Sequence, residues 1–450
     1  MTLTLDETRQ AMKSYWEEHS ANTSIETMML DSNARTLHEL ERPEILEKAP
    51  DMAGNIEFLC QDVCELECAP QSFDVIFSNW IFMYLSDDEV KKFAQKAVKW
   101  LRPGGKIFFR ESCFRQSGDV KRGANPTHYR HPSFYVSAFG SVVSEENNGK
   151  EVGFLQLESS SSISVYRKIK KNNGQVCFSY VKQVKEGSRE SIATFQKFLD
   201  EQQYSNKSIT RYEKIFGEGY VSTGGQSTTT EFVEKLNLQP GERVLDVGCG
   251  IGGGDFYMAR QFGVSVVGID LSTNMVHRAV ETSMQNPGVD CEFEICDATT
   301  REYPDESFDV VYSRDTILHI ADKEALFAKF FRWLKPGGRV LISDYCRGEQ
   351  DGTPHFKEYV KSRGYHLLSP SQYGGVLTKV GFTDVVAEDR TDHFVEVLKE
   401  ELARTLLSKD EFIQETSEQD FDDIVNGWNA KLVRCAEGDQ KWGLFYAKKA

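Results

Sequence analysis

The sequence predicts an α/β fold built on parallel β-sheets and present in two copies, and three features indicate it. Residues 72–75 (SFDV) recur as residues 307–310, and LRPGG at 101–105 recurs as LKPGG at 334–338, so the chain contains an internal duplication. Each copy alternates strand, polar helix, Pro-Gly-Gly turn and strand, an order typical of a parallel sheet. Residues 244–253 (VLDVGCGIGG) form a hydrophobic strand that ends in a glycine-rich turn before a helix.

The two copies differ in the part that precedes their shared segment. The second copy has a strand at 243–247, the glycine loop, a helix, a strand at 264–269 and another helix. In the first copy, residues 57–62 align without gaps with residues 292–297, but only a helical-looking segment stands before them. We therefore expect the first copy to lack the strand, loop, helix and strand that would hold a nucleotide-like cofactor.

The segment between the copies completes the domain organisation. Residues 141–190 contain three β-rich stretches, VGFLQLE, ISVYRKI and QVCFSYVKQV, which predict an antiparallel meander added to the first domain. The polar run at 201–208 is the predicted boundary. This divides the chain into residues 1–205, a truncated and degenerate copy, and residues 206–450, a complete catalytic domain.

The composition favours a small-molecule substrate. Lys and Arg total 53 against 69 Asp and Glu in 450 residues, and a net charge of −16 has the wrong sign for binding nucleic acid or an anionic membrane. No signal-like segment begins the chain and no stretch approaches about 18 apolar residues, so we expect a soluble, cytoplasmic protein. Cys60, Cys64 and Cys68 cluster without a histidine, so we expect reduced thiols and no metal site.

Three aspartates end three successive strands of the second copy. Asp246 ends the first strand, Asp270 ends VVGID about 20 residues after the glycine loop, and Asp297 ends EFEICD. A carboxylate after the second strand can accept both ribose hydroxyls of a cofactor, although such aspartates also cap helices. With the Pro-Gly-Gly turn, the pattern resembles the Rossmann-like class I methyltransferase fold. The seven-stranded sheet of that fold ends in an antiparallel strand, here residues 442–449.

Asp315 and His319 follow the fourth strand and suit an amine acceptor. On a helix, their spacing would put both on one face. An aliphatic amine with a pKa near ~10.4 is protonated at neutral pH, so a histidine would have to remove the proton while a carboxylate holds the ammonium. A histidine packed under the sheet rim is the alternative. The matching positions of the first copy are Trp80 and Tyr84, which lack both groups.

Tyrosines and an arginine stand near these positions in the sequence. Tyr345 follows the fifth strand, and Tyr359 and Arg363 are four apart in FKEYVKSRGYHL. A guanidinium flanked by phenols can bind a phosphate group. Tyr212 and Tyr220 lie on RYEKIFGEGYVSTGG, which could fold over the site as a lid. Aromatic pairs that only pack, and an arginine that stays solvated, are the alternatives.

Four segments, RYEKIFGEGYVSTGG, SRDTILHI, ISDYC and FKEYVKSRGY, resemble the phosphoethanolamine N-methyltransferases, and the resemblance extends to MMLDSNA and NPTHYR. It implies S-adenosylmethionine as methyl donor and S-adenosylhomocysteine as product. It also implies that Tyr212 and His319 form a catalytic pair and that Asp315 positions the ammonium.

The same resemblance implies binding residues for the acceptor and for the cofactor. Those implied for the acceptor are Tyr220, Tyr345, Tyr359, Arg363, Tyr365 and Lys431. Those implied for S-adenosylmethionine are Asp246, Gly248, Gly250, Asp270, Leu271, Asp297 and Ala298.

The resemblance also implies a place in phosphatidylcholine precursor synthesis. In this family, nematodes divide the pathway between a protein with a working N-terminal domain and one with a working C-terminal domain, and this sequence resembles the latter. We therefore expect phosphomonomethylethanolamine and phosphodimethylethanolamine to be converted to phosphocholine. A methyltransferase for an unphosphorylated amine, one that also accepts phosphoethanolamine, and a non-catalytic scaffold role for the N-terminal half are the alternatives. The sequence does not predict the oligomeric state.

Overall fold

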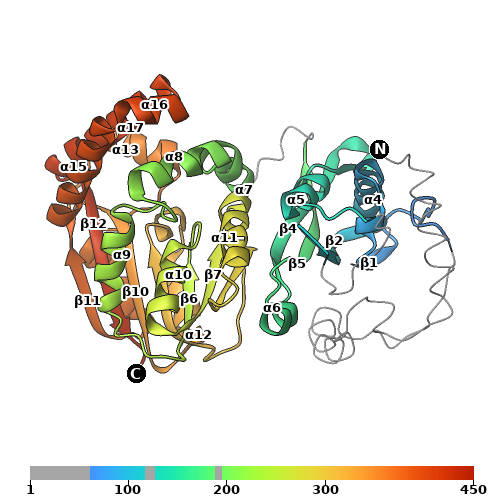
Figure 1. The fold of residues 1–450 in the computed structure, drawn as a ribbon, viewed down its shortest axis with the longest axis horizontal. Coiled ribbons are helices and arrows are strands. Elements are labelled where there is room, and N and C mark those ends of the chain that lie inside the picture. The colour runs from blue at the N-terminus through green and yellow to red at the C-terminus, as the bar shows by residue number, and fades with distance from the viewer. Residues whose placement is uncertain (1–60, 117–126, 188–194) are drawn as a thin grey trace. The chain divides into compact units, whose positions relative to one another are not determined.

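The computed structural model describes residues 61–116, 127–187 and 195–450, and the chain divides into two compact units, Met1–Ala193 and Thr194–Ala450 (Figure 1). The division falls earlier than the predicted boundary at residue 205. The short segments α7 (Phe195–Phe198) and η4 (Leu199–Gln203) therefore belong to the second unit. Asp200 explains this, because its carboxylate accepts hydrogen bonds from the hydroxyls of Ser272 (2.7 Å) and Thr273 (2.6 Å).

In the described part of the second unit, seven strands form one sheet in the order β8-β7-β6-β9-β10-β12-β11. Their bounds are β6 Arg243–Val247, β7 Ser265–Asp270, β8 Cys291–Cys296, β9 Phe308–Arg314, β10 Leu334–Arg347, β11 Thr383–Asp389 and β12 Gln440–Lys448. The first five strands in this order pair in parallel, and β12 is antiparallel to both neighbours. The predicted methyltransferase-like sheet is confirmed. Because the strand order reverses between β6 and β9, a ligand crevice is expected at their carboxyl ends.

Helices cover this sheet and the carboxyl ends of its strands. Those that pack along the sheet are α9 (Gly225–Glu234), α10 (Gly253–Phe262), α11 (Thr273–Gln285), α12 (Lys323–Trp333) and α14 (Pro370–Val380). Those that gather at one end of the sheet in Figure 1 are α8 (Asn206–Phe216), α13 (Pro354–Arg363), α15 (Thr391–Leu407), α16 (Lys409–Glu415) and α17 (Glu418–Ala436). Side-chain oxygens of Ser205, Ser272 and Asp322 cap the first turns of α8, α11 and α12.

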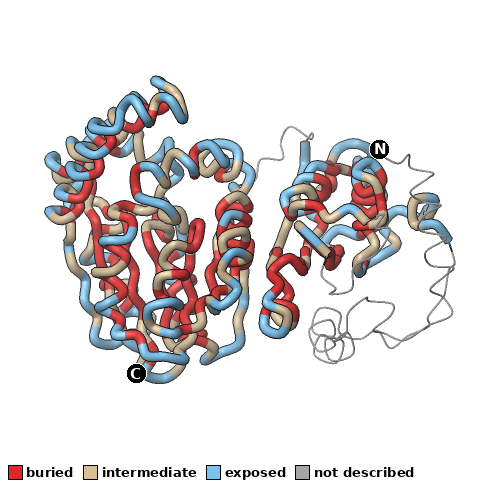
Figure 2. The backbone as a smooth tube through the Cα atoms, viewed as in Figure 1, coloured by how far each residue is buried: buried red, intermediate tan, exposed pale blue. Residues whose placement is uncertain are grey.

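The core of the second unit lies between the sheet and the helices α12 and α14. Phe327, Phe330 and Trp333 of α12 are fully buried. Tyr373 of α14 stacks on Phe445 of β12 with 4.0 Å between the ring centres. Figure 2 shows burial concentrated in the strands, whereas exposed positions are frequent on α15 to α17. The sheet is therefore a packed platform for the segments that follow its strands.

The first unit carries a smaller sheet in the order β1-β2-β5-β4, with β3 paired to β4. Its strands are β1 Phe73–Asn79, β2 Leu101–Ser112, β3 Val143–Glu146, β4 Glu151–Ser162 and β5 Gln175–Glu186, and its helices are η1 Phe82–Tyr84, α4 Asp87–Trp100, α5 Pro132–Gly140, η2 Asn147–Gly149 and α6 Ser164–Lys170. β1 and β2 are parallel, whereas β2, β5, β4 and β3 pair in antiparallel fashion. Two of the three stretches of the predicted meander, VGFLQLE and QVCFSYVKQV, form the antiparallel strands β4 and β5.

One stretch of the predicted meander is wrong. The sequence ISVYRKI forms helix α6 rather than a strand. Ile163 and Tyr166 are both buried and stand three positions apart, which is a helical spacing. The ring of Tyr166 packs edge-on against Trp80 with 6.0 Å between the centres. Lys171, in a left-handed conformation with φ 49°, ends the helix.

The internal repeat appears as a repeated piece of structure. β1-η1-α4-β2 in the first unit and β9-η5-α12-β10 in the second follow the same order, where η5 is Ile317–His319. The strand register also repeats, since Phe73 pairs with Leu101 and Phe308 with Leu334. The predicted loss of the first copy's cofactor loop depends on residues 1–60, which lie outside the described residues, as do MMLDSNA and Cys60.

Two observations bear on the expectations from composition. Within the described ranges, no helix combines the length and apolar character that crossing a membrane requires. In the same ranges, Cys64 and Cys68 are half-buried, and no group of His, Cys, Asp and Glu side chains is arranged to hold a metal ion.

Candidate active site

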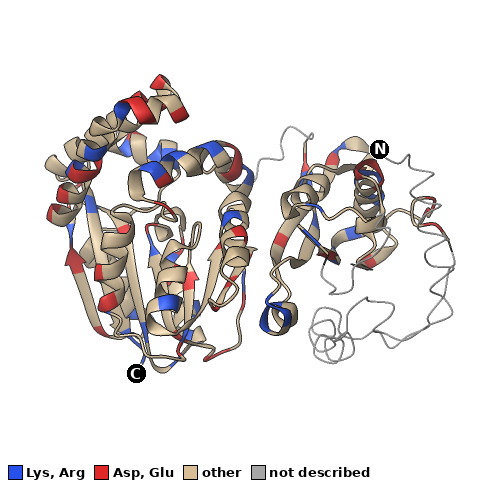
Figure 3. Cartoon of the chain, in the orientation of Figure 1, with Lys and Arg blue, Asp and Glu red and all other residues tan. Residues whose placement is uncertain are grey.

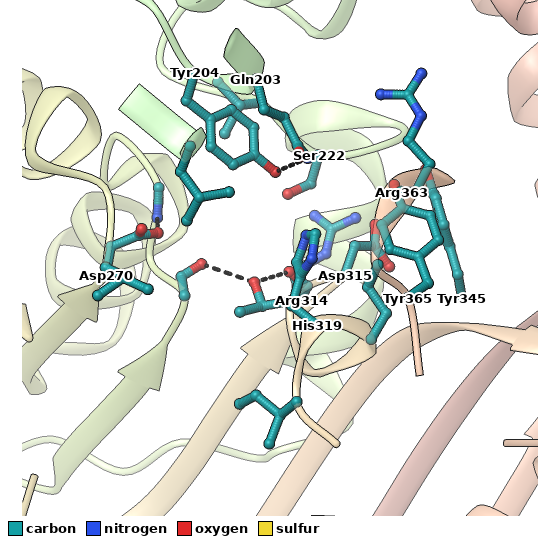
Figure 4. A pocket seen from close by; sticks show the side chains of 18 of the residues that line it. Gln203, Tyr204, Ser222, Asp270, Arg314, Asp315, His319, Tyr345, Arg363 and Tyr365 are labelled. Atoms are coloured by element: carbon teal, nitrogen blue, oxygen red, sulfur yellow. Dashed lines mark hydrogen bonds between the residues drawn. The ribbon is translucent and has the colours of Figure 1, made fainter. Parts of the chain in front are cut away.

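A cavity of about 1220 Å³ lies at the carboxyl ends of the second unit's strands. The segments that follow β6 to β10 line it, together with residues of α8, α13 and α17. Figure 4 shows Asp270 on one side, Arg363 and Tyr365 on the other, and Asp315 and His319 between them. We call the part of the cavity around Asp270 the cofactor side, the part around Asp315 and His319 the central zone, and the part around Arg363 and Tyr365 the anion-binding side.

Helix α8 is held against α17 by ion pairs. Lys207 and Arg211 of α8 both pair with Asp420 of α17, at 2.7 and 3.0 Å, and Lys214 pairs with Glu415 of α16. Figure 3 shows Lys and Arg positions interspersed with Asp and Glu positions along these helices. This wall of the cavity thus depends in part on charge pairs that salt can screen.

The glycine loop after β6 forms the cofactor side. Gly248 and Gly250 have positive φ angles of 82° and 56°. A Cβ atom at Gly248 would lie 2.1 Å from the hydroxyl oxygen of Thr316, so a larger residue does not fit there. The Gly250 N–H donates to Asp270 Oδ2 (3.0 Å) and the Ser272 N–H donates to Asp270 Oδ1 (2.8 Å), which fixes the loop to the end of β7.

Two carboxylates on this side suit a nucleoside. Burial raises the pKa of Asp270 to about 6, against the effect of its backbone N–H donors. Asp297 Oδ1 accepts from the N–H (2.8 Å) and the hydroxyl (2.7 Å) of Thr299. Leu271 and Ala298 line the cavity beside them. Carboxylates so placed can accept hydrogen bonds from ribose hydroxyls and from an amino group.

Asp246, which is predicted to bind the cofactor, does not line the cavity. It is only 4% exposed and lies beside the fully buried Asp255 of α10. Burial raises the pKa of Asp246 to about 7 and that of Asp255 as well, because two carboxylates this close cannot both ionise. The pair therefore supports the glycine loop from behind.

Asp315 stands in the central zone, but not on a helix as its spacing from His319 suggested. It has a positive φ of 48° and is followed by the three-residue turn η5, which carries His319. Oδ1 of Asp315 accepts from Trp442 Nε1 (2.8 Å) and from the Ser343 hydroxyl (3.3 Å). Oδ2 is buried and has no hydrogen-bond partner among the described residues. One carboxylate oxygen is therefore fixed and the other is free for a ligand.

His319 lies between two aromatic rings. Its ring centre is 5.4 Å from that of Phe195 and 5.2 Å from that of Tyr365. Burial lowers the pKa of His319 to about 4, and the cation of Lys323 acts in the same direction. Nδ1 is buried and lacks a hydrogen-bond partner within the described part of the chain. The imidazole is neutral at physiological pH and can accept a proton.

The anion-binding side contains the predicted phosphate residues Tyr345, Tyr359, Arg363, Tyr365 and Lys431, all of which line the cavity. The rings of Tyr359 and Tyr365 meet edge-on at 5.9 Å. Lys431 Nζ lies 4.0 Å from the Trp428 ring centre and 5.7 Å from that of Tyr345. Burial lowers the pKa of Lys431 to about 8. This side joins two cations to several phenol groups, which suits a phosphate.

Sequence reasoning missed a third cation on this side. Arg434 of α17 lines the cavity, is 5% exposed, and stacks on Tyr359 with 3.8 Å between its guanidinium carbon and the ring centre. Its Nε donates to Gln440 Oε1 (2.8 Å). The residue stands three positions after Lys431 on the same helix, and that spacing was the signal that could have identified it.

The lid tyrosines are placed differently from one another. Tyr212 lines the cavity and packs against Tyr204, with 6.4 Å between the ring centres. Tyr220 does not line the cavity, because its ring packs against the start of α10, where a Cβ on Gly253 would lie 3.0 Å from it. Tyr204, which the sequence analysis did not select, lines the cavity. Its pKa is raised by burial and by the nearby negative charges of Asp270 and Asp315.

Comparison with known proteins identifies the family. Two family models, each described as a methyltransferase domain, match residues 238–363 and 15–109. Phosphoethanolamine N-methyltransferase 1 of Arabidopsis thaliana is 49% identical to this chain, and the alignment covers 100% of each of the two chains. The chain belongs to the phosphoethanolamine N-methyltransferase family. Phosphoethanolamine N-methyltransferase 2 of Caenorhabditis elegans is 32% identical over 83% of this chain and 84% of its own.

Solved structures of this family share the fold. Phosphoethanolamine N-methyltransferase 2 of Haemonchus contortus, in complex with phosphomonomethylethanolamine and S-adenosylhomocysteine, matches with a TM-score of 0.79 at 29% identity, over 91% of this chain and 92% of that one. The resemblance seen in the sequence is thus confirmed. The Arabidopsis alignment has 498 positions against 450 residues here, so that relative has positions without a counterpart in this chain.

Proposed function

We propose that the second unit transfers a methyl group from S-adenosylmethionine to the nitrogen of a phosphorylated ethanolamine base and releases S-adenosylhomocysteine. The observation that carries this proposal is the order of groups in the cavity. The neutral His319 and the free oxygen of Asp315 stand between a nucleoside-binding side and a cationic side. The relatives' names and the Haemonchus contortus complexes support the proposal.

The cofactor side fits S-adenosylmethionine, whose sulfonium supplies the methyl group. The glycine loop leaves backbone, rather than side chains, against the cavity, and a Cβ at Gly248 would have no room. Asp270 would accept the ribose hydroxyls, and Asp297 would face the adenine edge. Asp246 would stay behind the loop and act on the cofactor only through it.

The acceptor residues divide the remaining work. The Asp315 oxygen that has no partner would hold the ammonium, and the neutral imidazole of His319 would take its proton so that the nitrogen lone pair becomes available. Tyr204 is half-buried and lies close enough to Asp270 and Asp315 for both charges to raise its pKa, whereas Tyr212 packs against its ring. We therefore assign to Tyr204 the role of the phenol that assists His319, and to Tyr212 the role of packing against the Tyr204 ring.

The direct test of this function uses the whole chain. The protein is incubated with S-adenosylmethionine and, separately, with phosphoethanolamine, phosphomonomethylethanolamine and phosphodimethylethanolamine, and the products are identified by mass. We expect phosphocholine from the methylated acceptors. If an unphosphorylated amine were methylated equally well, the alternative hypothesis of a small-amine methyltransferase would be favoured.

The net charge of −16 and the free thiols support a cytoplasmic enzyme.

Replacing Arg363 with alanine should raise the acceptor KM about tenfold or more while changing kcat less, because a lost charge-assisted contact to phosphate weakens ground-state binding. Steady-state kinetics with phosphodimethylethanolamine measure this. Arg332→Ala is the matched control, since Arg332 lies outside the cavity and pairs with Asp305 (3.0 Å) on the surface. An unchanged acceptor KM in Arg363→Ala would contradict the phosphate assignment.

A fragment of residues 194–450 should methylate phosphobases without the first unit, because every residue that lines the cavity lies at position 195 or beyond. A fragment of residues 206–450 should be inactive. It lacks Gln203 and Tyr204 of the cavity and the hydrogen bonds of Asp200 to α11. Comparing kcat/KM and Tm of both fragments with the full chain tests this. An inactive but folded longer fragment would show that the first unit contributes more than a scaffold.

A further inference from the structure

A buried lysine holds the turn that carries His319. Lys323, the first residue of α12, is 3% exposed. Its Nζ donates to the carbonyl oxygens of Ile317 (2.6 Å) and Ile320 (2.9 Å). These two carbonyls stand at the first residue of η5 and just after its last. The ammonium therefore ties both ends of this short turn together.

A buried acid holds the same turn from the other side. Asp344 of β10 is fully buried and accepts from the Tyr345 N–H (3.1 Å) and the Tyr373 hydroxyl (3.3 Å). The N–H of Leu318, within the turn, lies near this carboxylate and lowers its pKa. Burial nevertheless raises the pKa of Asp344 to about 8, and the positive charge of Lys323 opposes that rise. The acid thus lies beside the turn, and the cation binds two of its carbonyl oxygens.

The first unit contains the same arrangement around its own turn, η1. Glu111 of β2 is fully buried and accepts from the N–H groups of Phe82 (2.7 Å) and Met83 (3.2 Å). Arg130, also buried, donates to the carbonyl oxygen of Phe82 (2.8 Å) and to that of Leu85. In the internal repeat, the two turn carbonyls and the acid match Ile317, Ile320 and Asp344 position for position.

The cations of the two units come from different places in the chain. Lys323 begins the helix after the turn, whereas Arg130 follows β2, yet both reach the same two carbonyls. The turn therefore needs a buried cation in both units, including the one that has Trp80 and Tyr84 in place of Asp315 and His319. In the second unit, that cation also lies close enough to His319 for its charge to act on the imidazole.

We propose that Lys323 is a positioning residue for the methyl transfer: together with Asp344, it fixes the turn that presents His319 and places a buried cation beside that turn. This inference rests on the proposed function only in taking His319 as the proton acceptor. Lys323 touches neither acceptor nor cofactor in this role, because it does not line the cavity and its Nζ donates to two carbonyl oxygens of the turn.

Several other groups face the imidazole, and each bears on its titration. They are Arg363 at the end of α13, and Tyr365 and His366 just after that helix. Phe195 of α7 is apolar and only excludes water. Arg363 is exposed, so water screens its charge, whereas Lys323 is buried and its effect on the imidazole is the larger.

The test is the pH profile of kcat in Lys323→Met with phosphodimethylethanolamine. Loss of a neighbouring cation raises the pKa of His319 from about 4 towards its ordinary value, so the acidic limb should move to higher pH by roughly half to one unit. Lys335→Met is the matched control, because Lys335 pairs with Asp309 (2.8 Å) away from the cavity. Lys323→Arg keeps the charge and should restore the wild-type limb. A lower kcat with an unmoved limb would overturn the proposal.

A second variant and a second readout keep the proposal testable where Lys323→Met does not fold. Asp344→Asn retains the lysine charge, so its acidic limb should stay or move to lower pH, and an upward shift would overturn the proposal. The imidazole of His319 can also be titrated by NMR in histidine-labelled protein, with the signal assigned by its loss in His319→Asn. That titration measures the effect of Lys323 on the pKa of His319 even if the wild-type protein methylates no phosphobase. Such a lack of activity would contradict the proposed function but not the role of Lys323.

Discussion

Replacing His319 with alanine should lower kcat for phosphobase methylation by roughly 10²- to 10⁴-fold, the usual effect of losing a general base. The imidazole is neutral because burial lowers its pKa to about 4, and it lies between the rings of Phe195 and Tyr365. Affinity for S-adenosylhomocysteine should change little, because the cofactor side belongs to other strands. Steady-state kinetics and calorimetry measure the two quantities.

The control for this variant is His393→Ala. His393 lies outside the cavity and pairs with Glu231 at 3.2 Å, so its loss should leave kcat near the wild-type value. Comparable rates for both histidine variants would exclude His319 as proton acceptor. In the same assay, Tyr204→Phe should lower kcat more than Tyr212→Phe does, and the reverse order would return the paired role to Tyr212.

The features that could be predicted from the sequence are those that depend on a short run of neighbouring residues. A hydrophobic strand that ends in glycines is visible in a few residues, and Asp270 and Asp297 follow strands whose carboxyl ends must meet at one edge of a parallel sheet. The repeat was equally readable, because short identical segments stand in the same order in both copies. These patterns predicted residues that the structure brings to one cavity, among them Asp270, Asp297, Asp315 and His319.

The features that could not be predicted depend on contacts between distant parts of the chain. Asp315 is held by Trp442, 127 positions later, in a left-handed conformation that no spacing rule suggests. Tyr204 enters the cavity because Asp200, just before it, binds the start of α11. Asp246 follows the strand pattern as expected, but it is buried beside Asp255 of the next helix and does not line the cavity.

The two turns show how a retained structural device can be mistaken for a functional one. The positions of Asp315 and His319 differ between the copies, whereas the acid that holds the turn is kept as Glu111 and Asp344. Residues that both copies share include the acid that lies beside the turn. Residues that the first copy lacks include the proposed catalytic groups Asp315 and His319. Only the structure separates the two, because it shows which groups face the turn and which face the cavity.

Phosphomonomethylethanolamine and phosphodimethylethanolamine should be used with kcat/KM values roughly 10- to 200-fold above that for phosphoethanolamine, the range expected when methyl groups fill apolar space. The structural reason lies at Asp315. Trp442 and Ser343 occupy Oδ1, so one oxygen remains for N–H donors. A primary ammonium carries three such donors and would leave some unpaired in a buried site, at a cost of about 1–3 kcal/mol each.

Initial-rate assays with the three acceptors measure this selectivity, and Trp442→Phe tests its cause. Removing the indole N–H frees Oδ1 of Asp315 for a second N–H donor, so the ratio of kcat/KM between phosphodimethylethanolamine and phosphoethanolamine should fall. Trp333→Phe makes the same substitution in the core, away from the cavity, and should leave the ratio unchanged. Equal kcat/KM for all three acceptors in the wild-type protein would contradict the selectivity. An unaltered ratio in Trp442→Phe would assign it to the cavity's apolar walls instead of to the single free oxygen of Asp315.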